Sequence, residues 1–193
     1  MLVVGCGESV VGIPRKPTIP SIGVNHCWKW VETQYLLVLG EPIEQHYTIK
    51  NRGVINYSTP EAFFMTEGGQ KAWEQYWSIE RNIVSFTRDF PNEGVPIRQK
   101  KIYAAATESS IGTALGIALY MGAKRVGVIG VDITNHPHLS QRIDTYNDCM
   151  SQMNGVAAAY GSQIYNLSPQ SALDAFPFIS FEEFLDNAVS NNP

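Results

Sequence analysis

The chain has 193 residues, of which 44% are hydrophobic and 17% charged, with a formal net charge of −4 at pH 7. This length suits one domain with a full core, and the composition excludes a disordered or fibrous chain. The tightest basic group, Arg98, Lys100 and Lys101, reads as a solvated turn, so we expect no nucleic-acid partner. No apolar run approaches the roughly 20 residues of a membrane helix, so we expect a soluble protein without a membrane span.

The cysteines and the N-terminal residues predict the compartment. Cys6, Cys27 and Cys149 match neither a zinc pattern nor a disulfide framework, which favours a reducing environment. Met1 leads straight into an apolar strand, and no signal peptide is visible. We therefore expect a cytoplasmic protein. Assembly into a homo-oligomer is left open.

Alternating strand and helix signals predict the fold class. Several short apolar runs are hydrophobic throughout, as strands covered on both faces are. The predicted strands are 1–5, 19–25, 35–39, 54–57, 82–86, 102–105, 125–130 and 163–167, and the predicted helices are 110–121, 144–160 and 181–188. This order predicts βαβ units. We expect an α/β fold, namely a Rossmann-like three-layer sandwich with a mostly parallel sheet, in a single nucleotide-binding domain over 1–193.

Residues 59–96 interrupt this alternation and are rich in aromatic side chains. We interpret them as a helical insertion that packs on the sheet edge or forms a lid over the site. The alternative is that these aromatics are ordinary core residues at helical spacing, because such stripes usually mark an inward face.

The first strand runs directly into a glycine-rich turn with the sequence Gly-Cys-Gly-Glu-Ser at 5–9. Gly5 and Gly7 allow a tight turn and let a phosphate approach backbone N–H groups without a Cβ in the way. Open α/β sheets bind ligands at this end of the first strand, which favours a nucleotide or phosphate site that includes Ser9. An ordinary βα turn is the alternative, and Glu8 would repel a phosphate unless its side chain points away.

Polar residues also follow the second strand and precede the clearest helix. Asn25 ends the second strand, where its amide can hold a ribose or a base edge, although Asn also favours turns. Thr107, Ser109 and Ser110 bring hydroxyl groups to a helix N-terminus, which attracts anions. Simple capping is the alternative reading, and both roles can hold at once.

Two later strands end in polar residues as well. One delivers Asp132 to its carboxyl end, and the following loop carries His136 and His138. The two histidines do not share one helix face and no cysteine is near, so we predict a general base or a phosphate contact rather than a metal site. The other strand leads into a hydroxyl-rich turn with Ser168 and Ser171.

Taken in order, these segments resemble a Rossmann-like superfamily. It holds the small bacterial sialyltransferases that use CMP-sialic acid, the Maf-type flagellin glycosyltransferases and the MptE-like 6-hydroxymethylpterin diphosphokinases. That group opens with a strand and Gly-x-Gly-Pro-Ser-Leu, where this chain has Gly-Cys-Gly-Glu-Ser-Val at 5–10. A strand-end Asn, a Thr/Ser-rich turn before a small-residue helix, an Ile-Gly-x-Asp strand and a late Leu-Ser-Pro-x-Ser segment match Asn25, 107–122, 129–132 and 167–171. The resemblance covers roughly 1–40 and 101–193.

The resemblance implies roles for these residues, with the glycine turn on the phosphates and a histidine as the base. The implied nucleotide-binding residues are Gly5, Gly7, Ser9, Asn25, Thr107, Ser109, Ser110, Ser168 and Ser171, and the implied catalytic residues are Asp132, His136 and His138. Two positions depart from the group: Glu8 replaces the motif proline, and Gly40 stands where an acidic residue is expected, with Glu41 beside it. Both departures weaken the diphosphokinase reading, which needs carboxylates for Mg²⁺.

The function implied is a nucleotide-dependent group transferase, most like a nucleotide-sugar glycosyltransferase with a CMP-type donor and an unidentified acceptor. One alternative is an MptE-like diphosphokinase that moves diphosphate from ATP to a hydroxymethyl acceptor and needs Mg²⁺. Another is a nucleotide-binding protein without catalysis. An NAD oxidoreductase is disfavoured, because the turn lacks a third glycine and no acidic residue ends the second strand.

Overall fold

The computed structural model describes residues 1–37, 62–66, 83–89, 101–103, 109–133 and 143–189. Their strands form one eight-stranded sheet in the order β6-β5-β4-β3-β2-β1-β7-β8, and every pairing is parallel. The strands are β1 (Leu2–Val4), β2 (Ser21–Val24), β3 (Tyr35–Leu37), β4 (Ala62–Thr66), β5 (Ile83–Asp89), β6 (Lys101–Tyr103), β7 (Arg125–Ile129) and β8 (Gln163–Asn166).

Five of these strands reproduce the core of a Rossmann sheet. In the order β3-β2-β1-β7-β8, chain order runs outward from β1 in one direction and then restarts on its other side at β7. This is the 3-2-1-4-5 arrangement, and its reversal between β1 and β7 is the place where open α/β sheets bind ligands. The predicted fold class, an α/β Rossmann-like sandwich with a parallel sheet, is confirmed.

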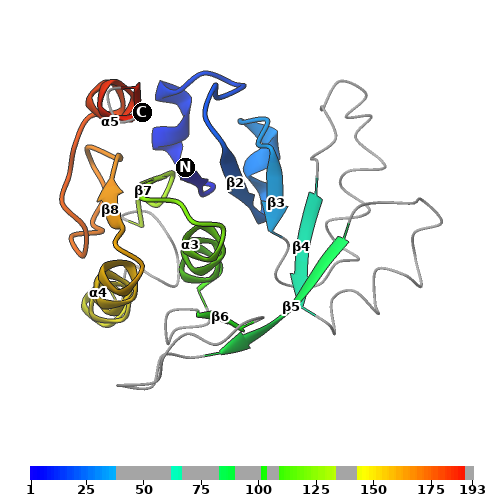
Figure 1. Ribbon diagram of the computed structural model, residues 1–193. Coiled ribbons are helices and arrows are strands. Elements are labelled where there is room, and N and C mark those ends of the chain that lie inside the picture. The colour runs from blue at the N-terminus through cyan, green and yellow to red at the C-terminus, as the bar shows by residue number, and fades with distance from the viewer. Residues whose placement is uncertain (38–61, 67–82, 90–100, 104–108, 134–142, 190–193) are drawn as a thin grey trace.

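Helical segments cover both faces of the sheet (Figure 1). They are η1 (Glu8–Gly12), η2 (Asn25–Lys29), α3 (Ser110–Tyr120), α4 (Ile143–Ala159) and α5 (Phe181–Val189). α3 and α4 pack with Val3, Ile22 and Val128 on one face. The segments η1, η2 and α5 pack with Leu2 and Val4 on the other. Alternate residues of β1 thus enter different cores, which is why the strand is apolar throughout.

α3 is the central helix of its layer and contacts α4, β1, β2, β6 and β7. Its residues from Ile111 to Leu119 are all buried, so it is apolar on every side rather than amphipathic. Within the described ranges, no helix has both the length and the apolar character needed to cross a bilayer; the longest, α4, has 17 residues.

Within 59–96, residues 62–66 form the strand β4 where a helical insertion was predicted, whereas β5 confirms the predicted strand 82–86. Both strands extend the sheet in parallel beyond β3. Phe64 of β4 is buried and packs against Tyr35 of β3, so at this position the aromatic residue belongs to a sheet surface and not to a helix face. The rest of 59–96 and the predicted strand 54–57 lie outside the described residues.

Candidate functional site

A cavity of about 1250 Å³ opens at the carboxyl ends of β1, β2 and β7. Its wall includes the turn after β1, the residues after β7, the first turn of α3 and the segment that enters α5. The volume exceeds the roughly 300–1,000 Å³ that is usual for small-molecule sites, so a nucleotide-sized ligand fits. Among the predicted residues in its wall are Gly5, Gly7, Ser9, Asn25, Ser109, Ser110 and Asp132.

The turns after β1 and β7 meet in what we call the β1–β7 junction, formed by Gly5, Gly7, Ser9, Gly130 and Asp132. Here the strand ladder continues past the strand ends, with Gly5 N–H donating to Ile129 O and Gly7 N–H to Gly130 O, both at 2.8 Å. A Cβ on Gly5 would overlap the carbonyl of Gly130, and one on Gly7 would lie 2.6 Å from Asp132 Oδ2. The glycines therefore allow two protein segments to approach one another.

Ser9 and Asp132 are bonded across this junction. The Ser9 N–H donates to Asp132 Oδ2 at 2.8 Å, and the Ser9 hydroxyl donates to Oδ1 at 2.5 Å. Ser9 Oγ also lies 3.0 Å from the Gly130 N–H and 2.8 Å from Ser168 Oγ. Because the hydroxyl proton of Ser9 points to the carboxylate, Ser168 is the donor in the second contact. Both lone pairs and the proton of Ser9 are thus used within the protein.

Ser168 and Ser171 likewise bond to the protein. Ser168 Oγ accepts from the Gly130 N–H at 3.1 Å, so this amide is shared between two serines. Ser171 Oγ donates to the carbonyl of Val131 and accepts from the Leu173 N–H at 3.0 Å. These bonds fix the turn after β8 against the end of β7. Neither serine lines the cavity, whereas their neighbours Pro169 and Gln170 do.

On the other side of the cavity lies the α3 start, which we define as Asn25, Ser109, Ser110 and Tyr146. Ser109 caps α3, since its Oγ accepts from the N–H groups of Ile111 and Gly112. Asn25 Nδ2 donates to Ser110 Oγ at 3.2 Å, and Ser109 Oγ lies 3.1 Å from Tyr146 Oη. The end of β2 and the first turns of α3 and α4 are thus joined by polar side chains.

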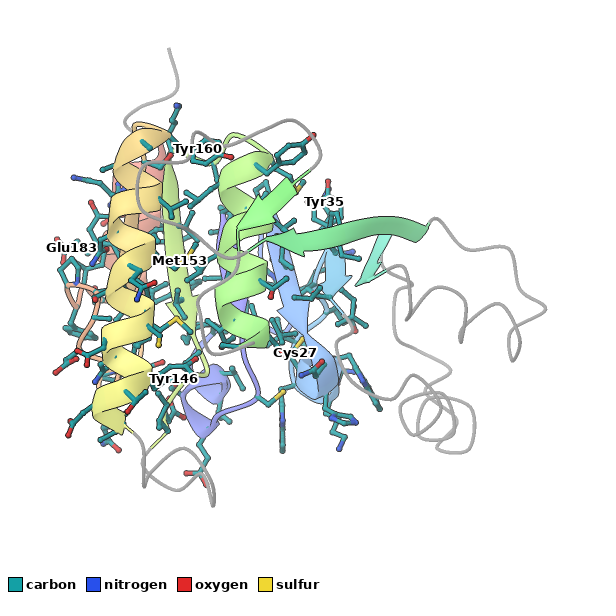
Figure 2. The ribbon with its side chains drawn as sticks, turned by 90° about the horizontal axis from the view of Figure 1, so that it is seen from below. Cys27, Tyr35, Tyr146, Met153, Tyr160 and Glu183 are labelled. Carbon is teal, nitrogen blue, oxygen red and sulfur yellow. The ribbon has the colours of Figure 1, made fainter. Side chains whose placement is uncertain are left out.

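Tyr146 comes from the first turn of α4 and is 3% exposed. Figure 2 shows it at the same end of the molecule as Cys27, with Tyr160 at the opposite end of the helix. Burial raises the pKa of Tyr146 to about 12, against a smaller lowering by the hydrogen bond with Ser109. Tyr146 is therefore a neutral phenol at physiological pH.

Backbone strain is found in the cavity wall. Among the described residues, the two non-glycine residues with positive φ are Asn25 at 50° and Ile133 at 61°, and both line the cavity. Asn tolerates this conformation, but a β-branched residue does not adopt it readily. Such strain persists where the surrounding structure enforces it, and it is enriched at functional sites.

The charged residues in the described part of the wall are acidic: Glu8, Asp132 and Glu182. Anion binding by the described wall would therefore depend on N–H and O–H donors. In the described ranges, no group of three or more potential metal ligands is present.

Cys6 also lines the cavity. Desolvation raises the pKa of its thiol, and the thiol donates to Val24 O at 3.3 Å.

Sequence reasoning and structure differ in what they assign to the site. Thr107, His136 and His138 lie outside the described residues, so their predicted roles stay predictions. Tyr146, Phe178 and Glu182 line the cavity but were not predicted. Tyr146 had one signal in the sequence, because it lies at the start of the first predicted helix after Asp132, which ends a strand.

In comparisons with known proteins, no family model, no curated protein and no solved structure matches the chain.

Proposed function

We propose that this protein is a nucleotide-dependent group transferase, with transfer of a sugar from a nucleotide sugar as the reaction. The observation that carries the proposal is the position of the cavity, at the carboxyl ends of β1 and β7 where the strand order reverses. Rossmann-like sheets bind nucleotides at this point. The sequence resemblance to CMP-sialic acid sialyltransferases supports the same ligand class.

The chemistry of the wall fits a nucleotide bound by neutral donors. The N-terminus of α3 carries a positive partial charge and faces the cavity through Ser109 and Ser110. Donors of this kind also stabilise the charge that develops on a departing nucleoside phosphate. A proton from the acceptor hydroxyl would pass to His136 or His138, which follow Asp132 and Ile133 in the sequence.

Diphosphate transfer is the second candidate, and one observation favours it. Glu8, Asp132 and Glu182 lie in the cavity wall, and Mg²⁺ that carries a nucleotide is usually held by one or two carboxylates together with the phosphates. In the described ranges these three carboxylates do not gather into one metal-binding group, so a single one of them would have to serve. Asp132 already accepts two hydrogen bonds from Ser9, so Mg²⁺ binding there would require this pair to open.

A thermal-shift series with nucleotides tests both candidates. A ligand at about 100 times its dissociation constant adds about 2.7 kcal/mol, which for a domain of this size is a rise in Tm of about 5–10 °C. We expect CMP or CDP to give this rise in the presence of EDTA. A rise with ATP alone, and only with Mg²⁺, would select the diphosphokinase. No rise with any nucleotide at millimolar concentration would refute both.

A further inference from the structure

The hydrogen-bond directions at the α3 start can be worked out from the number of lone pairs. A serine hydroxyl has one proton and two acceptor positions. Ser109 Oγ accepts from the N–H groups of Ile111 at 3.2 Å and Gly112 at 3.4 Å. Both acceptor positions are then occupied, so the proton of Ser109 lies in its 3.1 Å contact with Tyr146 Oη. Tyr146 is therefore the acceptor in that bond.

The phenol proton of Tyr146 is consequently left to donate elsewhere. Among the described residues, no other group takes part in a hydrogen bond with Tyr146 Oη. The side chain is 3% exposed and lines the cavity, so the protein withdraws this donor from bulk water. A buried donor without an acceptor costs free energy, which a ligand oxygen would recover.

Ser110 is arranged in the same way. Asn25 Nδ2 donates to Ser110 Oγ at 3.2 Å, so the hydroxyl proton of Ser110 is also directed to another acceptor. Ser110 is the first residue of the 11-residue helix α3, whose N-terminal dipole favours negative charge. Two hydroxyl groups with available protons thus stand at one helix N-terminus in the cavity wall.

We propose that Tyr146 donates its phenol proton to a phosphoryl oxygen of the ligand, with Ser110 and the first turn of α3 as the other donors. This assigns Tyr146 as a binding residue and places the phosphate at the α3 start rather than in the glycine turn. The inference rests on the proposed function only in that the phosphate is part of a nucleotide. The phenol of Tyr146 is neutral at physiological pH, which agrees with a donor role.

The experiment compares Tyr146→Phe with the wild type by isothermal titration in EDTA, using inorganic diphosphate, CMP and cytidine as probes. Phenylalanine keeps the buried ring and removes only the hydroxyl. One hydrogen bond to a charged group corresponds to a loss of affinity of about 10- to 100-fold. We expect this loss for diphosphate and CMP and an unchanged affinity for cytidine. Tyr120→Phe is the matched control, because Tyr120 is 48% exposed at the far end of α3.

Other outcomes separate this inference from the proposed function. Equal affinity of the wild type and Tyr146→Phe for diphosphate overturns the inference, even if CMP binds. Diphosphate binding that depends on Tyr146, without any nucleotide binding, supports the anion site and refutes the transferase. Failure of the wild type to bind diphosphate or CMP also overturns the inference. If Tyr146→Phe does not fold, Ser110→Ala must show the same selective loss for diphosphate, and its absence refutes the shared site.

Discussion

The two sides of the cavity use their polar groups differently. At the β1–β7 junction, Ser9 and Asp132 satisfy one another, and Gly5 and Gly130 are in close backbone contact. At the α3 start, Ser110 and Tyr146 accept hydrogen bonds from their neighbours and keep their own protons. The first side thus uses its polar groups within the protein, and the second holds the two hydroxyl groups that we propose as ligand donors.

This difference changes how the glycine motif is understood. A glycine-rich turn after the first strand is usually read as a phosphate cradle. Here Gly7 has φ −74°, which any residue adopts, and it is required because a Cβ would collide with Asp132. The same residue type thus serves packing in one protein and ligand approach in another. The neighbouring atoms distinguish the two cases.

The largest effect is expected from Gly130→Ala, at the centre of the junction. Gly130 has φ +76°, and a Cβ there would lie 2.5 Å from Val10 Cγ1 and 2.9 Å from the Gly5 carbonyl carbon. Left-handed strain costs about 1–2 kcal/mol and overpacking about 1–3 kcal/mol, so we expect a loss of roughly 2–5 kcal/mol. Urea unfolding measures it.

Gly122→Ala is the matched control for that measurement. Gly122 has φ +87°, but a Cβ there meets nothing within 4 Å, so only the backbone strain of about 1–2 kcal/mol applies. Equal losses in the two variants would show that the close contact in the junction contributes nothing.

Alkaline unfolding probes the α3 start. The pKa of Tyr146 is raised from 10.0 to about 12 in the folded protein, so the unfolded chain releases this proton first. The stability contributed by the neutral phenol is complete below pH 10 and falls by about 1.4 kcal/mol per pH unit as pH rises toward 12. The difference in unfolding free energy between wild type and Tyr146→Phe should shrink over this range. A constant difference would contradict the burial of a neutral phenol.

Asp132→Asn tests the carboxylate of the junction. Asparagine keeps the shape but has one acceptor oxygen instead of two, so one of the two donors of Ser9 loses its partner. We expect a loss of about 1–3 kcal/mol in urea unfolding. In the Asp132→Asn protein, Ser9→Ala should then lower the free energy of unfolding by less than it does in the wild type. Equal losses in the two backgrounds would mean that the two residues act independently.

Ser110→Ala should have the smallest effect on stability. Its hydroxyl accepts one hydrogen bond, from the side chain of Asn25, and the capping is done by Ser109. We expect a loss of about 0.5–1 kcal/mol, below that of Asp132→Asn. A larger loss for Ser110→Ala would reverse the comparison and make the α3 start the more rigid side.

Much of the fold could be predicted because local patterns carry it. The apolar runs predicted β1, β2, β3, β5, β6, β7 and β8 within a few residues, and Ser109 and Gly122 marked the limits of α3. β4 was missed, because its neighbouring aromatics were assigned to a helix. The local sequence of a short aromatic segment is compatible with a strand or with a helix. Here the parallel pairing with β3 selects the strand.

The candidate site was predicted in position but only partly in chemistry. Polar residues at the carboxyl ends of parallel strands must share one edge, so the sequence placed Gly5, Asn25, Ser109 and Asp132 around one region, and all four line the cavity. Which hydroxyls remain available depends on partners that are distant in sequence. Ser9 meets Asp132 across 123 residues, and Ser109 meets Tyr146 across 37.

By itself, the sequence determined an α/β chain with a parallel sheet and a polar edge, because the apolar runs of strands and the capping residues of helices are patterns of residues close in sequence. Only the tertiary structure decided that the glycine turn is a packed junction and that the buried Tyr146 hydroxyl meets Ser109 in the cavity wall. These assignments depend on hydrogen-bond valence and atomic contact between distant segments, which periodicity and motif spacing do not encode.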